Sequence, residues 1–413
     1  MAAEGRPHLR ALTGLRFVAA FQVLAYHGLG TGPQSAWWMR GLVGSGYVGV
    51  SLFFVLSGFV LTYTYHDSLR DGTATRGAFL AARVARIYPV YLLSLLVALP
   101  PVFWLVASRG VRMQYGWLAG LTGMYAGLLQ AWDPRRACVL NCPAWSLSDE
   151  AFFYLAFLLV LPVVARWGMR RLAVAAGAAY ALALLAPVLY LVLRPDGAVP
   201  ATPAAPVSQA YWLAVVKYNP LIRLPEFVMG VIAGRLFLLE GGTRRWHVWL
   251  EAGAVGVLGA VLLASPAIPY PLMHNGLLAP AFAALVYALA RGAGPVSRVL
   301  ATRMLVRLGA ASFSLYILHV PLLAWMSRGY RTFGVALPPQ PWHFAIFATG
   351  SIAVSLVVFD VVEEPGRRLL RRLLVRRRAD PPTLGGMARE GTEVRGMEDR
   401  ELVSREGGRP GEI

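Results

Sequence analysis

The sequence predicts an all-α integral membrane protein with about ten transmembrane helices and one re-entrant segment. Of its 413 residues, 57% are hydrophobic and only 15% are charged, whereas an ordinary soluble domain has about 45–50% apolar residues. Apolar runs of about 18 residues or more, long enough to cross a bilayer as helices, recur along almost the whole chain. These observations predict one membrane domain over residues 1–379 and a disordered cytoplasmic tail over residues 380–413.

Ten apolar runs are candidate membrane spans. In chain order they cover residues 11–30, 46–65, 87–107, 147–165, 172–193, 221–239, 248–265, 276–290, 308–327 and 341–362. An eleventh run, 113–131, is ambiguous between a span and a segment that enters the membrane and returns on the same side. Such a segment is tolerated where protein shields its backbone.

Arginine clusters decide between these alternatives. The formal net charge is +18, and the arginines lie in short clusters between apolar runs rather than along one polar face, which disfavours nucleic acid as a partner. If residues 113–131 crossed the bilayer, every cluster from Arg166 onward would lie outside, against the positive-inside rule. The sequence therefore predicts a re-entrant or interfacial segment there, both termini in the cytoplasm, and an external loop over residues 194–218.

The first span, LRFVAAFQVLAYHG, carries both Arg16 and His27. At about 100° per residue they share a helix face to within about 20° and are separated by roughly 16 Å along the axis. Both are expected to face the bundle interior, because a charge near the bilayer centre costs about 2.5–3.5 kcal/mol. His27 is then either a hydrogen-bonded packing residue or a functional group near the external boundary.

Glu150, in PAWSLSDEAFFYL, enters the membrane at about the depth where His27 leaves it. It is either a partner in an ion pair or the partner of a base. A glutamate that accepts a hydrogen bond from one imidazole nitrogen fixes the tautomer and leaves the other nitrogen free to take a proton from a hydroxyl. Asp149 is rotated by about 100° from Glu150 and is expected to face elsewhere.

Arg83 and Arg86, in ARVARIYPVYLLSLL, lie at the predicted cytoplasmic start of a span. Exposed backbone N–H groups and the helix dipole favour an anion there, and two arginines add bidentate phosphate donors. The alternative is that they only anchor the topology. A cytoplasmic phosphate site below a polar stripe that ends at His27 suggests a long cofactor with its reactive end deep in the bundle, and coenzyme A thioesters have that shape.

Two further pairs are each open to two interpretations. Arg223 and Glu226, spaced i, i+3 at the outer end of a span, form either an intramembrane ion pair or part of an acceptor site. Tyr316 and His319 share a face by the same spacing, and His319 is either a packing or pore-lining residue or a second base.

The two cysteines, in CVLNC, form either a disulfide in an oxidising compartment or two free thiols. No set of His, Cys, Asp and Glu residues has metal-ligand spacing, so no metal cofactor is expected.

These residues resemble the membrane-bound acyltransferase 3 family over nearly the whole hydrophobic body, from about Arg10 to about Arg372. The resemblance rests on the Arg16 and His27 pattern and on GYVGVSLFFVLSGFVL, Arg83 and Arg86 before IYPVYLL, AWSLSDEAFFY, IRLPEFVMG, SFSLYILHVP and EEPGRR, in that order. It implies transfer of an acyl group, usually acetyl, from cytoplasmic acyl-CoA to a sugar hydroxyl of a surface polysaccharide, a lipid or a secreted natural product. The chain departs from the family at Ser51, which is often acidic, and at Asp149, which is often aliphatic.

Together the residues and the resemblance predict a plasma-membrane O-acyltransferase whose partners are acyl-CoA, a sugar-containing acceptor and the lipid bilayer. The roles expected are His27 and Glu150 in catalysis; Arg16, Arg83 and Arg86 on acyl-CoA; and Arg223, Glu226, Tyr316 and His319 on the acceptor. In this mechanism His27, oriented by Glu150, acts as a general base, although a route through an acylated His27 is equally compatible with the sequence. The alternative function is a multi-span transporter of a polar metabolite, in which the same buried charges line a substrate path.

Overall fold

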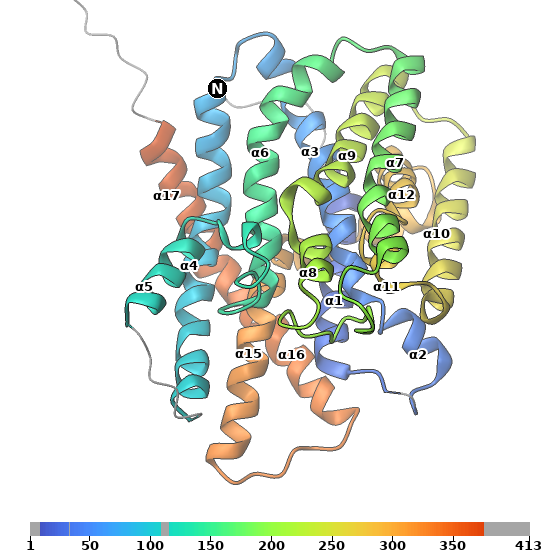
Figure 1. The fold of residues 1–413 in the computed structure, drawn as a ribbon. Coiled ribbons are helices and arrows are strands. Elements are labelled where there is room, and N and C mark those ends of the chain that lie inside the picture. The colour runs from blue at the N-terminus through green and yellow to red at the C-terminus, as the bar shows by residue number, and fades with distance from the viewer. Residues whose placement is uncertain (1–8, 33, 109–114, 376–413) are drawn as a thin grey trace, which may run out of the picture. The chain divides into compact units, whose positions relative to one another are not determined.

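The computed structural model describes residues 9–32, 34–108 and 115–375, and the predicted tail over residues 380–413 lies outside this part of the chain (Figure 1). Within it the regular structure is entirely helical, as predicted. The helices are α1 (Arg10–Leu29), α2 (Trp37–Leu42), α3 (Gly49–Arg70), α4 (Arg76–Ser108), α5 (Tyr115–Ala126), α6 (Trp145–Val164), α7 (Met169–Leu193), α8 (Tyr211–Tyr218), α9 (Pro220–Glu240), α10 (Trp246–Ala264), α11 (Tyr270–His274), α12 (Ala279–Arg291), α13 (Pro295–Leu300), α14 (Arg303–Ala310), α15 (Ser312–Thr332), α16 (Trp342–Val358) and α17 (Glu364–Val375). Short 3-10 turns are η1 (Gly46–Val48), η2 (Gln130–Trp132), η3 (Cys142–Ala144) and η4 (Ser265–Ala267), and η5 (Phe359–Glu363) is a π-helical turn.

Each of the ten predicted runs contains a helix, but fewer than ten helices meet the requirements for a membrane span. In the described part of the chain, seven segments are long and apolar enough, and the pair α14 and α15, bent by 58°, makes an eighth. The two predicted spans that fall short are α1 and α9, although they are 20 and 21 residues long. Each carries charged side chains inside its apolar run, which lowers its hydropathy.

The predicted re-entrant run contains α5, which has 12 residues. The described part of this helix is about 18 Å long, which is shorter than the about 30 Å of hydrocarbon that a span must cross. The chain that follows is irregular, and the Tyr125 hydroxyl accepts hydrogen bonds from the backbone of Val139 and Leu140 at 2.9 and 3.2 Å. The Gln130 side chain donates to Ala144 O at 2.6 Å. Protein groups thus satisfy this backbone, as a segment at membrane depth requires.

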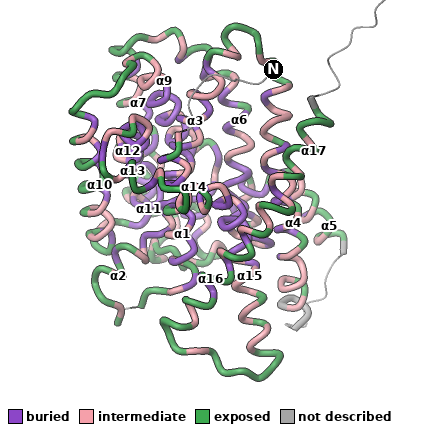
Figure 2. Tube along the Cα trace, turned by 180° about the vertical axis from the view of Figure 1, so that it is seen from behind, coloured by how far each residue is buried: buried purple, intermediate pink, exposed green. Residues whose placement is uncertain are grey.

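Buried residues gather where α1, α3, α9 and α12 lie, whereas the outer helices expose long apolar faces (Figure 2). The most apolar window of the segment Tyr270–Arg291 is 72% buried inside the protein, whereas that of α7 is 22% buried. Side chains such as Val192 and Trp249 are more than two-thirds exposed, at 71% and 77%. Apolar faces of this kind are those that lipid covers in a membrane bundle.

Glycines bring α3 and α9 into close contact at the centre of the bundle. A Cβ added to Gly230 would lie 1.9 Å from Val55 O, and one added to Gly58 would lie 2.2 Å from Phe227 O. Small residues of this kind let membrane helices approach backbone to backbone. The contact fixes α9 against α3, and α1 packs against α3, α14 and α15 on the other side.

Candidate active site

A first cavity, the arginine cavity, brings together four charged residues that the sequence singles out. It is lined by Arg16 from α1, Arg83 and Arg86 from α4, and Glu150 from α6. Apolar and aromatic side chains of α3, α4, α6 and α15 complete its walls. The charged residues of α1, α4 and α6 to which the sequence assigns catalytic or acyl-CoA-binding roles therefore line one cavity.

The three arginines of this cavity make no ion pair with any residue in the described part of the chain. Arg83 Nη2 donates a hydrogen bond to Tyr65 OH at 2.8 Å, and the guanidinium lies 5.2 Å from the centre of that ring. Its Nε atom is buried without a described partner. Guanidinium donors left unpaired in an enclosed space create a strongly positive potential that suits a phosphate-bearing ligand.

Glu150 lies among these arginines and not beside His27, which corrects the predicted pairing. Its Oε1 atom accepts hydrogen bonds from Tyr154 OH at 2.6 Å and from Ser57 Oγ at 3.1 Å. No hydrogen bond joins Glu150 to His27 in the described structure. The physical reason is depth: Glu150 lines the arginine cavity with Arg16, whereas His27, eleven residues further along α1, lines a different cavity.

This second cavity, the tyrosine cavity, contains His27 from α1 and Lys217 from α8. Most of its other side chains are aromatic. They are Tyr26, Tyr47, Trp145, Tyr218, Tyr270, His274 and Tyr316. His27 is exposed at this cavity, so its ring is accessible to a ligand.

Tyr316 lines both cavities and forms their common wall. Its hydroxyl lies 2.8 Å from Ser146 Oγ, a group of the arginine cavity, and donates to Pro143 O of the tyrosine cavity at 3.2 Å. Two sites of different chemical character, one lined by arginines and one lined mostly by aromatic rings, therefore meet at a single side chain.

His27 makes its contacts with its own helix and with His319. Its Nδ1 atom lies 2.9 Å from Val23 O, four residues earlier on α1, and 3.2 Å from Nε2 of His319 on α15. His319 is fully buried and lines neither cavity. Its described hydrogen bond to another side chain is with His27, so neither cavity places it where the predicted acceptor-binding role would need it.

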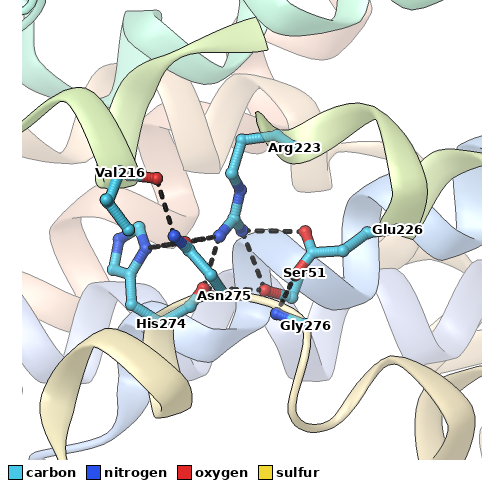
Figure 3. A network of polar contacts seen from close by, with 7 residues as sticks. All are labelled: Ser51, Val216, Arg223, Glu226, His274, Asn275 and Gly276. Atoms are coloured by element: carbon cyan, nitrogen blue, oxygen red, sulfur yellow. Dashed lines mark hydrogen bonds and ion pairs between the residues drawn. The ribbon is translucent and has the colours of Figure 1, made fainter. Parts of the chain in front are cut away.

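Arg223 and Glu226 form the ion pair that the sequence offered as one of two interpretations (Figure 3). Arg223 Nη2 lies 2.9 Å from Glu226 Oε2, and each side chain is 1% exposed. The same nitrogen donates to Ser51 Oγ at 2.9 Å, so the family's often acidic position here holds a hydroxyl that binds Arg223. Neither member of the pair lines the arginine or the tyrosine cavity, so the predicted acceptor contacts are not formed there.

The rest of this network ties α9 to the segment that precedes α12. Arg223 Nη1 donates to His274 O at 2.5 Å and to Asn275 Oδ1, and Glu226 Oε1 accepts from the Gly276 N–H at 2.6 Å. Asn275 in turn donates to Val216 O at 2.6 Å (Figure 3). Sequence reasoning did not single out His274 or Asn275, because no spacing links them to α9.

Lys217 is a site residue that the sequence could have revealed, because it is the only lysine among 39 basic residues. Its ammonium lies 5.0 and 5.5 Å from the ring centres of Tyr218 and Tyr270. Burial lowers the pKa of Lys217 from 10.5 to about 8. An amine with these neighbours is available to bind an oxygen atom of a ligand.

Cys138 and Cys142 form a disulfide, which resolves the alternative that the sequence left open. Cys142 lines the tyrosine cavity.

Comparison with known proteins gives one family and several relatives. The family model described as an acyltransferase domain matches residues 9–360. The acyltransferase MdmB of Streptomyces mycarofaciens is 30% identical over 400 residues, which cover 91% of this chain and 96% of the relative.

Two further relatives are more distant. The exopolysaccharide production protein ExoZ of Rhizobium meliloti is 28% identical over 347 residues, 80% of this chain and 92% of the relative. The peptidoglycan O-acetyltransferase OatA of Listeria monocytogenes is 22% identical over 380 residues, 88% of this chain and 56% of the relative. No solved structure gives a significant match.

Proposed function

Since the chain belongs to the membrane-bound acyltransferase 3 family, we propose that it transfers an acyl group, acetyl in the simplest case, from acyl-CoA to a hydroxyl of a sugar-containing acceptor. The observation that carries this proposal is the meeting of two cavities at Tyr316, one with three arginines that form no ion pair within the described residues and one with an accessible histidine. A transporter would need no such pairing of an anion site with a base.

The arginine cavity is the proposed donor site. Coenzyme A carries phosphate groups at one end of a long flexible arm and the thioester at the other. Arg83 and Arg86 would bind phosphate oxygens, and the arm would run along the face that carries Arg16 toward Tyr316. Glu150, bonded to Tyr154, stays on this side and limits the positive charge of the cavity.

The tyrosine cavity is the proposed acceptor site. Aromatic faces pack well against the apolar faces of rings, and a few convergent polar groups orient the ligand. Lys217 and His27 are such groups here. The acceptor hydroxyl would lie at His27, with the acceptor's remaining oxygens toward Lys217.

His27 is the proposed base. It takes the proton of the acceptor hydroxyl as the oxygen attacks the thioester carbonyl. The C–S bond then breaks, and the thiolate of coenzyme A takes the proton from the imidazolium of His27. In the alternative route the imidazole itself attacks the thioester, releases coenzyme A, and passes the acyl group to the acceptor oxygen. Both routes use the same free nitrogen of His27.

The test compares secreted metabolites and surface glycans by mass spectrometry in cells that lack the chain and in cells that express it or its His27→Ala variant. The wild-type chain should add acyl groups to one class of acceptor, and His27→Ala should not. Identical profiles with and without the wild-type chain would contradict the proposed transfer.

Arg83→Gln and Arg86→Gln are each expected to raise the KM for acyl-CoA by roughly 10- to 150-fold, because a charge-assisted hydrogen bond contributes about 1.5–3 kcal/mol. Turnover at saturating donor should change little. Steady-state kinetics on the detergent-solubilised protein measures both constants. Arg76→Gln is the matched control, since Arg76 is exposed on the same helix and does not line the cavity. An unchanged KM in both cavity variants would remove the proposed phosphate site.

We also propose that the protein lies in the plasma membrane with both termini cytoplasmic, so that the tyrosine cavity opens outside. A membrane-impermeant amine reagent applied to intact cells should then modify Lys217, with a pH midpoint near its pKa of about 8. Mass spectrometry of the peptide gives the extent of reaction. Because the chain has one lysine, Lys217→Gln provides a background without lysine modification. Reaction only after permeabilisation would invert the topology.

A further inference from the structure

We infer that His319 is a positioning residue that, together with the backbone oxygen of Val23, holds His27 with its proton on Nδ1 and its lone pair on Nε2. The inference rests on the proposed role of His27 as the base. It assigns to a second histidine the orienting task that the sequence assigned to Glu150.

The first step fixes the tautomer of His319. Its Nδ1 atom lies 2.6 Å from the backbone oxygen of Tyr316. A carbonyl oxygen only accepts hydrogen bonds, so Nδ1 of His319 must carry a proton. His319 is fully buried and forms no ion pair with a carboxylate in the described structure, so the ring is neutral. Its Nε2 atom therefore holds a lone pair.

The second step fixes the tautomer of His27. Two acceptors surround its Nδ1 atom, namely Val23 O at 2.9 Å and the Nε2 lone pair of His319 at 3.2 Å. Neither acceptor can supply a proton, so Nδ1 of His27 must carry one and donate it. The Nε2 atom of His27 is then the unprotonated nitrogen, and the ring that bears it lines the tyrosine cavity.

The third step is the rigidity of the turn that carries His319. Pro321 has no N–H, so the carbonyl of Ile317, four residues earlier, lacks its helical partner. Asn141 donates to this oxygen at 2.9 Å and to Ser94 Oγ at 3.2 Å, from a fully buried position. The segment between Tyr316 and Pro321 is thus held from outside α15.

The arrangement also suits the reaction. When Nε2 of His27 accepts the acceptor's proton, the ring becomes an imidazolium and its Nδ1–H becomes a stronger donor. The lone pair of His319 receives that stronger hydrogen bond, so the charged intermediate is stabilised by a neutral partner. No carboxylate is needed beside His27.

Two substitutions separate positioning from packing. His319→Leu fills the core with an apolar side chain but removes the acceptor for His27. We expect kcat to fall by about 10²-fold, which is the lower end of what general-base catalysis contributes. The KM for acyl-CoA should not change. His319→Gln offers an amide oxygen in place of the lone pair and should recover much of this loss. A His319→Leu enzyme with wild-type kcat per folded molecule, or equal losses in both variants, would overturn the inference.

A spectroscopic measurement reports the tautomer independently of activity. In protein labelled with ¹⁵N at the histidine rings, the signals lost in His27→Ala identify His27. We expect protonated Nδ1 and unprotonated Nε2 in the wild type and in His319→Gln. In His319→Leu the carbonyl of Val23 remains as an acceptor, so we expect Nδ1 to stay protonated but its signal to shift, because one of its two hydrogen bonds is lost. A protonated Nε2 in the wild type would refute the inference even if transfer activity were present. Conversely, a fully active His27→Ala enzyme would refute the proposed role of His27 as the base, whatever its tautomer in the wild type, and absence of transfer by the wild-type chain would refute the proposed function.

Discussion

His27→Ala is expected to lower kcat for acyl transfer by about 10²–10⁴-fold or more, since that is the usual contribution of a general base. The affinity for acyl-CoA should remain close to that of the wild type, because the three arginines lie in the other cavity. Donor binding and turnover measured on the same solubilised preparation provide both values. The effect should be as large by either chemical route, because both need the Nε2 lone pair.

The control for this change is His343→Ala. His343 is half-buried on α16, packs near Tyr330 and lines neither cavity. It removes an imidazole from the same membrane domain without touching the proposed site. If His27 were only a packing residue, His27→Ala would lower the thermal midpoint and leave kcat per folded molecule unchanged, and that result would exclude the mechanism.

Arg223→Met is expected to destabilise the fold by about 3–5 kcal/mol, the cost of leaving one charge of a buried ion pair without its partner. Glu226 is 1% exposed and would keep the hydrogen bonds of Gly276 N–H and Ser51 but no described cation. The physical cause is desolvation of the carboxylate. The midpoint of thermal unfolding in detergent should fall sharply relative to the wild type.

The double variant Arg223→Met with Glu226→Leu tests that cause. Replacing a whole buried pair by apolar side chains is often neutral, so the double variant should be more stable than Arg223→Met alone. Recovery should be partial, because His274 O and Asn275 Oδ1 also lose their donor. Arg307→Met is the exposed counterpart: the Arg307 and Asp360 side chains are 49% and 53% exposed, and such a pair contributes about 0–1 kcal/mol. Equal destabilisation by Arg307→Met and Arg223→Met would show that burial is not the cause.

Much of the fold follows from the sequence because its signals are local. Run length and hydropathy place a helix in each of the ten predicted runs, and helical periodicity predicts that Arg83 and Arg86 share a face. The number of spans is less certain from composition, since α1 and α9 carry the polar groups of the centre. The polar residues that line or support the candidate site also lower the hydropathy of these two helices below that of a typical membrane span.

The partners of His27 could not be derived in the same way. Which side chain meets which across two helices depends on the rotation of each helix about its own axis, and sequence spacing fixes this only within a helix. Glu150 and His27 have a similar predicted depth, yet Glu150 lies in the cavity that Arg16 lines and not in that of His27. His319 is 292 positions from His27, and only the packing of α1 against α15 brings them together.

The shared wall at Tyr316 has a consequence for how activated acyl groups reach an acceptor outside the cytoplasm. An acylation that takes place after a product has left the cytoplasm normally faces a supply problem, because activated thioesters are made and kept inside. If the arginine cavity on one side of Tyr316 is the donor site and the tyrosine cavity on the other side is the acceptor site, as proposed, only the acyl group has to change compartments. The proposed enzyme would thus make the activated acyl group of a cytoplasmic thioester available to an external acceptor, while coenzyme A stays in the cytoplasm.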